Sequence, residues 1–397
     1  MEISHAFKRL RIGFVSQMYI PIMDNEIKFT GKGIFEAYQL SQYSKKVVFI
    51  AFSSCNIPYK FVFNKMKFTL YLLPIEKIDT EAKPEKLVTL PITIIKNYLK
   101  TINYLCHILS YEKLDVVKIE NILLIGFPAF IASALTRTPF ILWIAGPELK
   151  VLNIKFQHFR VLQLISSLAF KIFSYAMIPN AKVLVNISPE SEKIILKALP
   201  RVYVKLDSNY VNVQMFHPNP CLKEKNKKVI LYVGRLEKEK GISLLLSAIE
   251  QISSKRNDFE VWIIGQGSLE EEIAKKIGEK LLPIKLLGEK DIRELPFFYN
   301  CADIFLLPSL VEGPSAALME AMSCGVAVIS TTGPIDHLQN GLLVRKDSAA
   351  IAEAINILLE DEDLRRKIAK NASKYVRLLS KRYMETMRNI YLFSASK

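Results

Sequence analysis

Two short segments in the C-terminal half of the chain carry charged side chains at positions suited to binding an anionic ligand. In VGRLEKEKG, residues 233–241, an apolar strand is predicted to end at Gly234, and Arg235 and Lys240 follow before Gly241 opens a helix. N–H groups at a helix N-terminus bind phosphate, Arg235 can hold two phosphate oxygens at once, and Lys240 adds a point charge. The spacing of a Walker loop is absent. The segment is therefore either another kind of phosphate-binding loop or a solvated charged turn.

The second segment is SLVEGPSAALMEAMSCG, residues 309–325, which places Glu312 before a predicted helix and Glu320 inside it. Ser315 is a suitable N-cap for a helix over 316–322. Carboxylates accept hydrogen bonds from sugar hydroxyls, and a vicinal diol supplies two donors. The spacing does not require the close pair of a retaining glycosidase, with carboxyl groups about 5–5.5 Å apart, so we expect the two glutamates to perform separate tasks on one ligand.

Other candidate sites are weaker. Gly265-Gln266-Gly267 follows a predicted strand, but Glu270 stands where a dinucleotide fingerprint has its third glycine. Asp361-Glu362-Asp363 is better placed to cap a following helix than to bind a metal. The five histidines show no metal-ligand spacing: His5, His107, His158, His217 and His337. We expect no metal and no cofactor besides the substrate.

Both halves of the chain alternate apolar strands with helical patterns, which predicts an α/β protein with parallel, doubly wound sheets. A charged, proline-bearing stretch at 216–228 suggests a linker between an N-terminal domain, 1–218, and a C-terminal domain, 219–379. The strands are predicted at 11–20, 45–52, 67–74, 114–120, 139–146, 182–188, 228–234, 259–265, 283–288, 302–309, 326–330 and 341–344. The helices include 34–43, 242–254, 269–277, 295–300, 316–322, 349–359 and 380–393.

Composition limits the location and the partners of the 397-residue chain. Five scattered cysteines without a CxxC pair suit a reduced, cytoplasmic compartment. No run of 18 uncharged apolar residues is present, and the N-terminus lacks the features of a signal peptide. The net charge is +15, and residues 1–218 hold 27 Lys and Arg against 15 Asp and Glu, so the excess lies in the N-terminal half. No nucleic-acid motif accompanies it, so we expect no nucleic-acid partner.

The N-terminal excess is either a solvated surface or a face for anionic lipid or a phosphorylated substrate. Residues 155–173, KFQHFRVLQLISSLAFKIF, combine basic residues with a long apolar face. They are either a buried helix with lysines at its rim or an interfacial helix at a membrane. The second alternative suits a lipid-linked acceptor and a peripheral position on the inner face of the membrane.

Taken together, these motifs resemble glycosyltransferase family 4, whose members are retaining enzymes of the GT-B fold. EGPSAALMEAMSCG resembles the E-x7-E motif of this family, and VGRLEKEKG resembles its phosphate-binding loop. Residues 286–309 and SNYVNVQMFHP, 208–218, resemble two further segments. The resemblance is almost continuous over the C-terminal half and weaker over the N-terminal half. It implies two Rossmann-like domains facing an interdomain cleft, with the C-terminal helix, 380–397, packing back on the first domain.

The resemblance also implies roles for individual residues. Arg235 and Lys240 would hold the donor diphosphate, and Glu320 would bind the ribose hydroxyls. Glu312 would face the donor sugar and, with Arg235 and Lys240, is the expected catalytic group. The remaining expected donor contacts are Gly313, Pro314, Ser315, Ala316, Lys290 near the base, and Gly31 and Gly33 from the first domain.

The implied function is transfer of a hexose-type sugar from a nucleotide-diphosphate sugar to a hydroxyl of a glycan or polyprenyl-phosphate-linked acceptor, with retention and without a metal. One departure affects the sugar side of the site, because Ala145 occupies the position where the family often has a histidine. A sugar-nucleotide epimerase of the same fold and a non-catalytic donor-binding subunit are the alternatives. Donor sugar, base and linkage are left open by the sequence.

Overall fold

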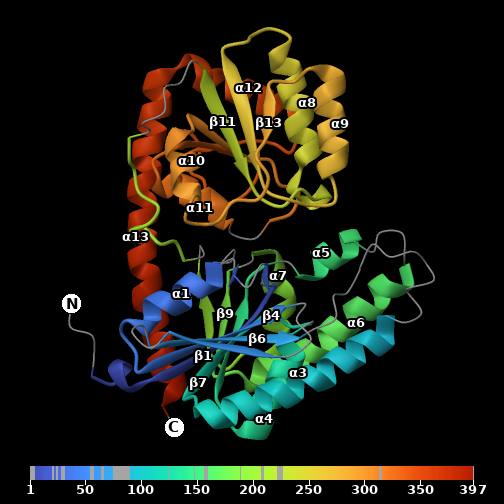
Figure 1. The fold of residues 1–397 in the computed structure, drawn as a ribbon, viewed down its shortest axis with the longest axis vertical. Helices are drawn as coiled ribbons and strands as arrows, with labels where there is room; N and C mark the ends of the chain where they lie inside the picture. Colours follow the sequence, from blue (N-terminus) through green and yellow to red (C-terminus); the bar gives the residue numbers. More distant parts are fainter. Residues whose placement is uncertain are drawn as a thin grey trace. The chain divides into compact units, whose positions relative to one another are not determined.

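The computed structural model contains two compact units, Met1–Leu206 with Met384–Lys397, and Asp207–Tyr383. Each unit is an α/β sandwich around a parallel sheet, as the alternation of strands and helices predicts. Figure 1 shows helices on both faces of the sheets. The structure describes residues 5–19, 22–23, 26–27, 32–53, 58–63, 67–74, 90–123, 125–146, 148–155, 160–187, 189–206, 210–220, 227–312 and 315–396.

The first unit is built on an eight-stranded sheet in the order β10-β9-β8-β7-β1-β4-β6-β5. All neighbours pair in parallel except β5 and β6, which are antiparallel. The strands are β1 Arg11–Tyr19, β4 Lys46–Ser53, β5 Tyr59–Phe63, β6 Phe68–Pro74, β7 Val116–Glu120, β8 Phe140–Ile144, β9 Val183–Asn186 and β10 Tyr203–Lys205. The helices are α1 Lys32–Ser41, α3 Leu90–Glu112, α4 Gly126–Thr136, α5 Glu148–Lys155, α6 Arg160–Met177 and α7 Pro189–Ile195, and a short hairpin joins β2 Ile22–Met23 to β3 Glu26–Ile27.

The second unit is built on a six-stranded parallel sheet in the order β13-β12-β11-β14-β15-β16. Its strands are almost wholly apolar because helices cover both of their faces. The strands are β11 Lys228–Val233, β12 Phe259–Ile264, β13 Ile284–Leu286, β14 Ile304–Leu307, β15 Ala327–Ser330 and β16 Leu342–Leu343. The helices are α8 Ile242–Ser253, α9 Glu270–Lys280, α10 Leu295–Cys301, α11 Ala316–Ser323 and α12 Ser348–Glu360.

The segment before β11 belongs to the second unit and packs against it. Phe216 is buried there, and its carbonyl accepts a hydrogen bond from the Ser323 hydroxyl at 2.5 Å. The division between the units lies at Leu206–Asp207, twelve residues before the boundary that the linker composition suggests. Cys301 is disulfide-bonded whereas Cys106 and Cys324 are free thiols, so not all of the cysteines are reduced as their spacing predicts.

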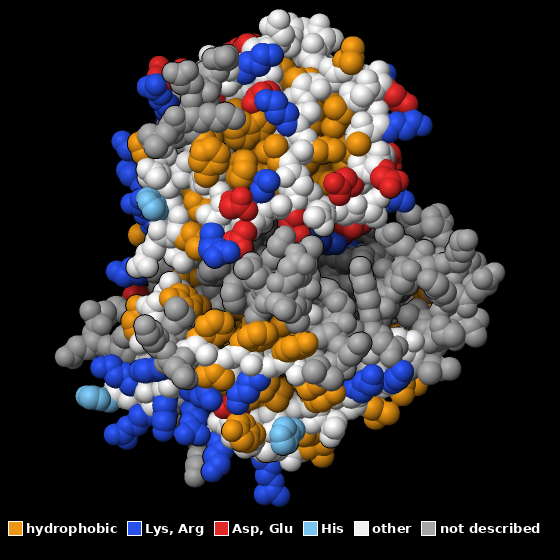
Figure 2. Space-filling view, in the orientation of Figure 1, with side chains coloured by type: hydrophobic (Ala, Val, Ile, Leu, Met, Phe, Trp, Pro, Cys, Tyr) orange, Lys and Arg blue, Asp and Glu red, His pale blue; other side chains and the backbone are white. Residues whose placement is uncertain are grey.

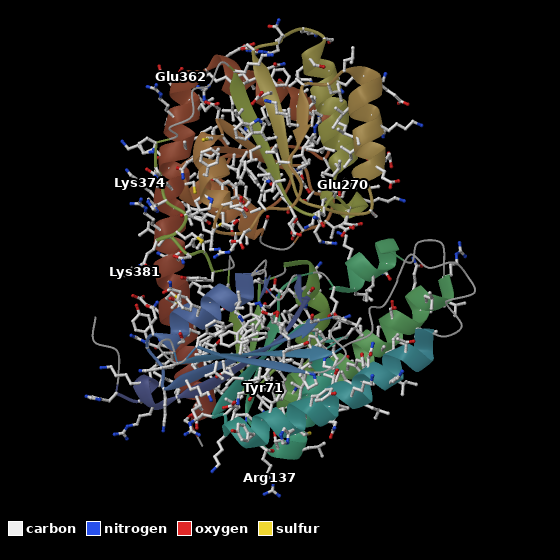
Figure 3. The ribbon with its side chains drawn as sticks, viewed as in Figure 1. Tyr71, Arg137, Glu270, Glu362, Lys374 and Lys381 are labelled. Atoms are coloured by element: carbon white, nitrogen blue, oxygen red, sulfur yellow. The ribbon has the colours of Figure 1, made fainter. Side chains whose placement is uncertain are left out.

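The last helix, α13, runs unbroken from Glu362 to Ala395, so the separate helix predicted to begin at Ser380 is the end of a longer one. The Asp361 carboxylate accepts a hydrogen bond from Leu364 N at 2.8 Å, which confirms the predicted cap. In Figure 3, Glu362 marks the beginning of α13, and Lys374 and Lys381 lie along it. The final turns belong to the first unit, where Tyr391 is fully buried with its ring 6.1 Å from that of Phe14.

One helix differs from the expectation that no segment could span a membrane. Among the described residues, the stretch Arg160–Asn180, which contains α6, is long and apolar enough to cross a membrane by length and composition. Only 22% of its apolar window is buried in the fold. The alternative of a buried helix is wrong for the outer face of α6, because several of its large apolar side chains are more than half exposed.

Candidate functional site

The two motif loops of the second unit emerge at the point where its strand order reverses. The chain adds β12 and β13 on one side of β11, and then returns to add β14, β15 and β16 on the other side. The crevice beyond the carboxyl ends of β11 and β14 is therefore the topological switch point, where open α/β sheets bind ligands. Arg235 and Lys240 follow β11, and Glu312 follows β14.

Glycines allow the loops at this edge to approach one another closely. Gly241 has φ +69°, and a Cβ there would lie 1.9 Å from the carbonyl oxygen of Pro308, after β14. Gly265 has φ +142°, and a Cβ would lie 1.9 Å from the Gly234 carbonyl oxygen. The glycine pair after β12, a weak cofactor signal in the sequence, therefore has a steric reason: neighbouring strand-end loops touch through their backbones.

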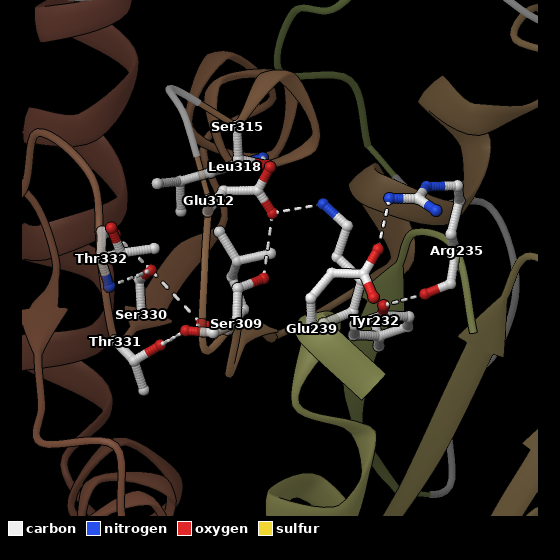
Figure 4. A network of polar contacts seen from close by, with 12 residues as sticks. Tyr232, Arg235, Glu239, Ser309, Glu312, Ser315, Leu318, Ser330, Thr331 and Thr332 are labelled. Atoms are coloured by element: carbon white, nitrogen blue, oxygen red, sulfur yellow. Dashed lines mark hydrogen bonds and ion pairs between the residues drawn. The ribbon is translucent and has the colours of Figure 1, made fainter. Parts of the chain in front are cut away.

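Lys240 and Glu312 come together from these two loops. The Lys240 ammonium lies 2.6 Å from Glu312 Oε2, and both side chains are about 85% buried. Ser309 Oγ donates to the same carboxylate oxygen at 3.0 Å. The loop after β14 is further fixed because Leu310 N donates to the Glu239 carbonyl at 2.9 Å. Figure 4 shows this network, with dashed lines from the Glu312 carboxylate, one of them to Ser309.

Arg235 makes a different contact. Its guanidinium donates to Glu239 Oε1 at 2.7 Å; the arginine is half exposed, whereas Glu239 is almost fully buried. Tyr232, at the end of β11, donates to the Arg235 carbonyl at 2.8 Å. Burial, and to a smaller extent the Glu312 carboxylate, raise the pKa of Tyr232, which keeps this hydroxyl a donor. Arg235 thus has an anchored backbone and an exposed head.

Glu320 is more buried than we expect of a residue that contacts a ligand. It is on α11 with a side chain that is 3% exposed, and Tyr299 of α10 donates to its Oε2 at 2.9 Å. Burial and then the Glu320 charge raise the pKa of Tyr299 well above its ordinary value, so the phenol stays protonated. The hydrogen bond from Tyr299 fixes the position of the Glu320 carboxylate. Its contact with ribose hydroxyls remains a prediction.

The other predicted donor contacts are distributed over several elements. Ser315 is the N-cap of α11, as predicted, and accepts from Leu318 N at 3.4 Å; Ala316 is the first residue of that helix. Lys290 is half-buried beyond β13. Gly33 lies in the first turn of α1 in the first unit. Gly31, Gly313 and Pro314 lie outside the described residues.

Four residues that contact the predicted site residues were not anticipated from the sequence. They are Tyr232, Glu239, Tyr299 and Ser309. The i, i+4 spacing of Arg235 and Glu239 is a signal that could have suggested their ion pair. No local signal connects Tyr299 with Glu320, because their contact depends on how α10 and α11 pack.

The described residues show no cluster of metal-binding side chains, and a pocket of the second unit is lined by residues outside the predicted site. Within the described ranges, no group of three or more His, Cys, Asp or Glu side chains is arranged to hold a metal ion. A pocket of about 230 Å³ in the second unit includes none of the predicted site residues. It is lined by Met215, His217, Asn219, Pro220, Pro296, Phe297 and Asn300.

Solved structures share this fold over nearly the whole chain. Sucrose-phosphate synthase from Thermosynechococcus elongatus matches with a TM-score of 0.70 at 18% identity, over 98% of this chain and 100% of that one. HepE of Anabaena, solved in complex with UDP and glucose, matches with a TM-score of 0.67 at 18% identity, over 96% and 99%. At these identities the likeness concerns the fold alone. The chain has the GT-B fold, as the sequence predicts.

Sequence comparison is more specific for the second unit. Residues 215–375 match the family model described as Glycosyl transferases group 1. The capsular polysaccharide biosynthesis glycosyltransferase CapM of Staphylococcus aureus is 35% identical over 185 residues, 43% of this chain and 48% of that protein. The phosphatidyl-myo-inositol mannosyltransferase of Mycolicibacterium smegmatis is 30% identical over 180 residues, 42% and 46% of the two chains. The chain thus matches less than half the length of these curated relatives. The segment that matches the family model contains Arg235, Lys240, Glu312 and Glu320.

Proposed function

We propose that the chain is a retaining glycosyltransferase that moves a hexose-type sugar from a nucleotide-diphosphate sugar to a hydroxyl of a glycan or lipid-linked acceptor. The observation that carries this proposal is the Lys240–Glu312 pair at the switch point of a sheet that matches group 1 glycosyl transferases. Retention and the E-x7-E assignment of Glu312 and Glu320 rest on the family resemblance.

In the proposed reaction the donor diphosphate binds at the loop that follows β11. When the bond between sugar and diphosphate breaks, negative charge grows on the leaving diphosphate. Lys240 and Arg235 would stabilise that charge where it develops, together with N–H groups at the N-terminus of α11. We expect this charge stabilisation to replace a metal ion.

Glu312 would have two tasks in this scheme. Its carboxylate positions the Lys240 ammonium at 2.6 Å, and its remaining acceptor capacity suits a sugar hydroxyl. Glu320, oriented by Tyr299, would accept hydrogen bonds from the ribose hydroxyls. Because the Glu320 side chain is almost fully buried, this role requires that side chain to become accessible when the ribose binds.

The acceptor is proposed to bind the first unit. One matched relative is named for capsular polysaccharide biosynthesis and another for mannosyl transfer to phosphatidyl-myo-inositol, which supports a glycan or lipid-linked acceptor for this chain. The basic excess of residues 1–218 supports contact with an anionic membrane. We propose a cytoplasmic enzyme that is peripheral on the inner face of the membrane.

A sugar-nucleotide epimerase is not favoured, because the matched curated relatives named above are glycosyltransferases. A non-catalytic donor-binding subunit is the remaining alternative, since Ala145 stands where the family often has a histidine. Turnover distinguishes the transferase from the binding subunit. An enzyme consumes the donor that it binds, whereas a binding subunit leaves the donor intact.

The test is nucleotide binding followed by turnover. Melting curves with UDP, GDP, ADP, dTDP and their sugar conjugates should show stabilisation by one nucleotide series, since a ligand present at 100 times its Kd adds about 2.7 kcal/mol. The double variant Arg235→Ala/Lys240→Ala should lose this shift. Lys276→Ala, an exposed lysine of α9 paired with Glu272, is the matched control and should keep it.

Donor consumption is then measured with membrane lipid extract as the acceptor source. Binding with turnover supports the transferase, and binding without turnover supports the non-catalytic subunit. If no nucleotide shifts the melting temperature of the wild-type chain even at millimolar concentration, the proposal is wrong.

A further inference from the structure

Helix α6 of the first unit exposes an unusually apolar face. Six of its large apolar side chains are between 55% and 71% exposed. They are Val161, Leu164, Ile165, Leu168, Ile172 and Tyr175. Surface apolar residues scattered singly need no explanation, but a continuous apolar surface indicates an interaction site.

The six residues form one stripe along the helix. At about 100° per residue they fall within an arc of roughly 100°. Arg160 and Lys171 lie just beyond one edge of that arc, and both are exposed. The stripe is therefore a continuous face with a basic rim, not a set of unrelated side chains.

The opposite face of α6 is occupied by the fold. Phe170, Ser174 and Met177 are buried, and the Phe173 ring stacks on Phe127 of α4 at 3.7 Å. Although the stretch is long and apolar enough to cross a membrane, crossing would require these contacts to break. The packing instead favours a helix that lies along a surface with its stripe outward.

The surroundings of the stripe are basic. Helices α3, α4 and α6 contain one acidic residue, Glu112, which is buried and bonded to Lys46 and Tyr71. Helix α5, which packs against α6, contains Glu148, whose carboxylate accepts hydrogen bonds from backbone N–H groups after β7. Exposed basic residues of α3, α4, α6 and their ends are Lys96, Lys100, Lys113, Arg137, Arg160 and Lys171. Figure 3 shows Arg137 pointing away from the body of the unit, and the visible face of the first unit in Figure 2 carries many blue and few red side chains among apolar ones.

We propose that the α6 stripe docks on an anionic lipid bilayer, with the helix in the plane of the interface. Apolar side chains would enter the region between headgroups and acyl chains, while Arg160 and Lys171 contact phosphates at its rim. Charge complementarity selects an anionic bilayer over a second copy of the chain, because two copies would bring equal basic rims together. The inference rests on the peripheral membrane position proposed above and assigns it to one surface, but it does not depend on sugar transfer.

The test is co-flotation of the full chain with vesicles. Wild-type chain should bind vesicles with about 30% phosphatidylglycerol and bind far less to pure phosphatidylcholine. The variant Leu164→Gln/Leu168→Gln/Ile172→Gln should reduce the bound fraction at least about tenfold. The matched control changes three exposed apolar residues of the second unit, Leu281→Gln/Leu343→Gln/Ile357→Gln, and should bind like wild type. Arg160→Gln/Lys171→Gln should weaken binding most at low salt.

Folding is checked independently, since all of these side chains are exposed and their variants should melt within a few degrees of wild type. In addition, the substitution Leu168→Trp should give a blue-shifted emission on adding anionic vesicles. Release of bound chain by alkaline carbonate supports an interfacial helix, and retention after that wash overturns the in-plane orientation. The proposal is overturned if the wild-type chain does not float with anionic vesicles. It is also overturned if the wild-type chain binds no vesicles but forms a dimer that the triple Gln substitution abolishes.

Discussion

At the scale of single residues, the site depends on charges that are matched across the sequence. Lys240 and Glu312 are 72 residues apart and mostly buried. A buried charge that loses its partner is destabilising, whereas replacing both partners removes the penalty. The pair should therefore behave as one unit in stability as well as in binding.

A double-mutant cycle tests that coupling. We expect Lys240→Met and Glu312→Gln each to lower the free energy of unfolding, and the double variant to lose less than the sum of the two by about 1 kcal/mol or more. The measurement is urea unfolding of all four proteins. The exposed pair Lys276–Glu272 on α9 is the control and should show a much smaller coupling. Strict additivity for Lys240 and Glu312 would contradict the ion pair.

A second residue-scale prediction concerns Glu120, at the end of β7 in the first unit. Burial raises the pKa of this carboxyl, while the Lys118 charge and the 2.5 Å hydrogen bond from Ser16 act in the opposite direction. An acid whose folded pKa is raised binds more protons in the native state, so stability falls as pH rises above the ordinary Glu pKa of about 4.3. Glu120→Gln removes this loss. Its melting temperature relative to wild type should therefore rise between pH 4 and pH 8.

Asp258 provides the contrast for that experiment. The side-chain hydrogen bonds from Arg256 lower the pKa of Asp258, so its contribution to stability is present above the ordinary Asp pKa and is lost as pH falls. Asp258→Asn should consequently change relative stability with pH in the opposite direction. The same slope for both variants would show that the environment of Glu120 is not the cause.

At the scale of elements, the loop between β11 and α8 positions both basic residues of the site. Gly241 ends the short 3-10 turn Lys238–Lys240 in a left-handed conformation and opens α8. Its backbone lies against the end of β14, where a Cβ would be 1.9 Å from the Pro308 carbonyl oxygen. The contact that brings Lys240 toward Glu312 is therefore one that only glycine permits.

Two glycine-to-alanine variants of the second unit should have opposite effects. Gly241→Ala should destabilise by at least about 1–2 kcal/mol, because the backbone is strained and Pro308 cannot move freely. Gly278→Ala, inside α9 where a Cβ meets nothing within 4 Å, should stabilise by about 0.5–1 kcal/mol. Denaturant midpoints check both. A Gly241→Ala chain as stable as wild type would contradict the close approach.

At the scale of the whole molecule, α13 makes the first unit depend on the last residues of the chain. The second unit is one continuous segment, Asp207–Tyr383, whereas the first requires Met384–Lys397 to complete its core. Tyr391 and Met387 are fully buried there. The two units should therefore respond differently to changes at the C-terminus.

Tyr391→Ala should destabilise the first unit by about 3–5 kcal/mol, the usual effect of removing a buried aromatic ring. The matched control is Phe393→Ala, two residues further along, where the ring is 53% exposed and little change is expected. The measurement is calorimetry, in which we expect Tyr391→Ala to lower the melting temperature of the first unit alone. Equal shifts in both transitions would mean that the units unfold together.

The sequence by itself determined most elements and the positions of the motifs. Strand alternation, the Ser315 cap, the Asp361 cap and the order of the two motif loops are local signals, because they depend on side-chain period and on backbone groups a few residues away. For that reason the predicted strands and helix α11 agree with the structure to within a few residues, whereas the edge strands β5 and β10 of the first sheet were not predicted.

Only the tertiary structure decided which charges meet and which apolar face is covered. Lys240 pairs with Glu312, and Tyr299 donates a hydrogen bond to Glu320, through the packing of elements that are separated in the sequence. An amphipathic period in α6 has the same form whether its apolar stripe faces the core or the solvent, so the sequence left both alternatives open. The covered face is set by what α4 and the sheet already fill, and in this fold the stripe of α6 is left outside.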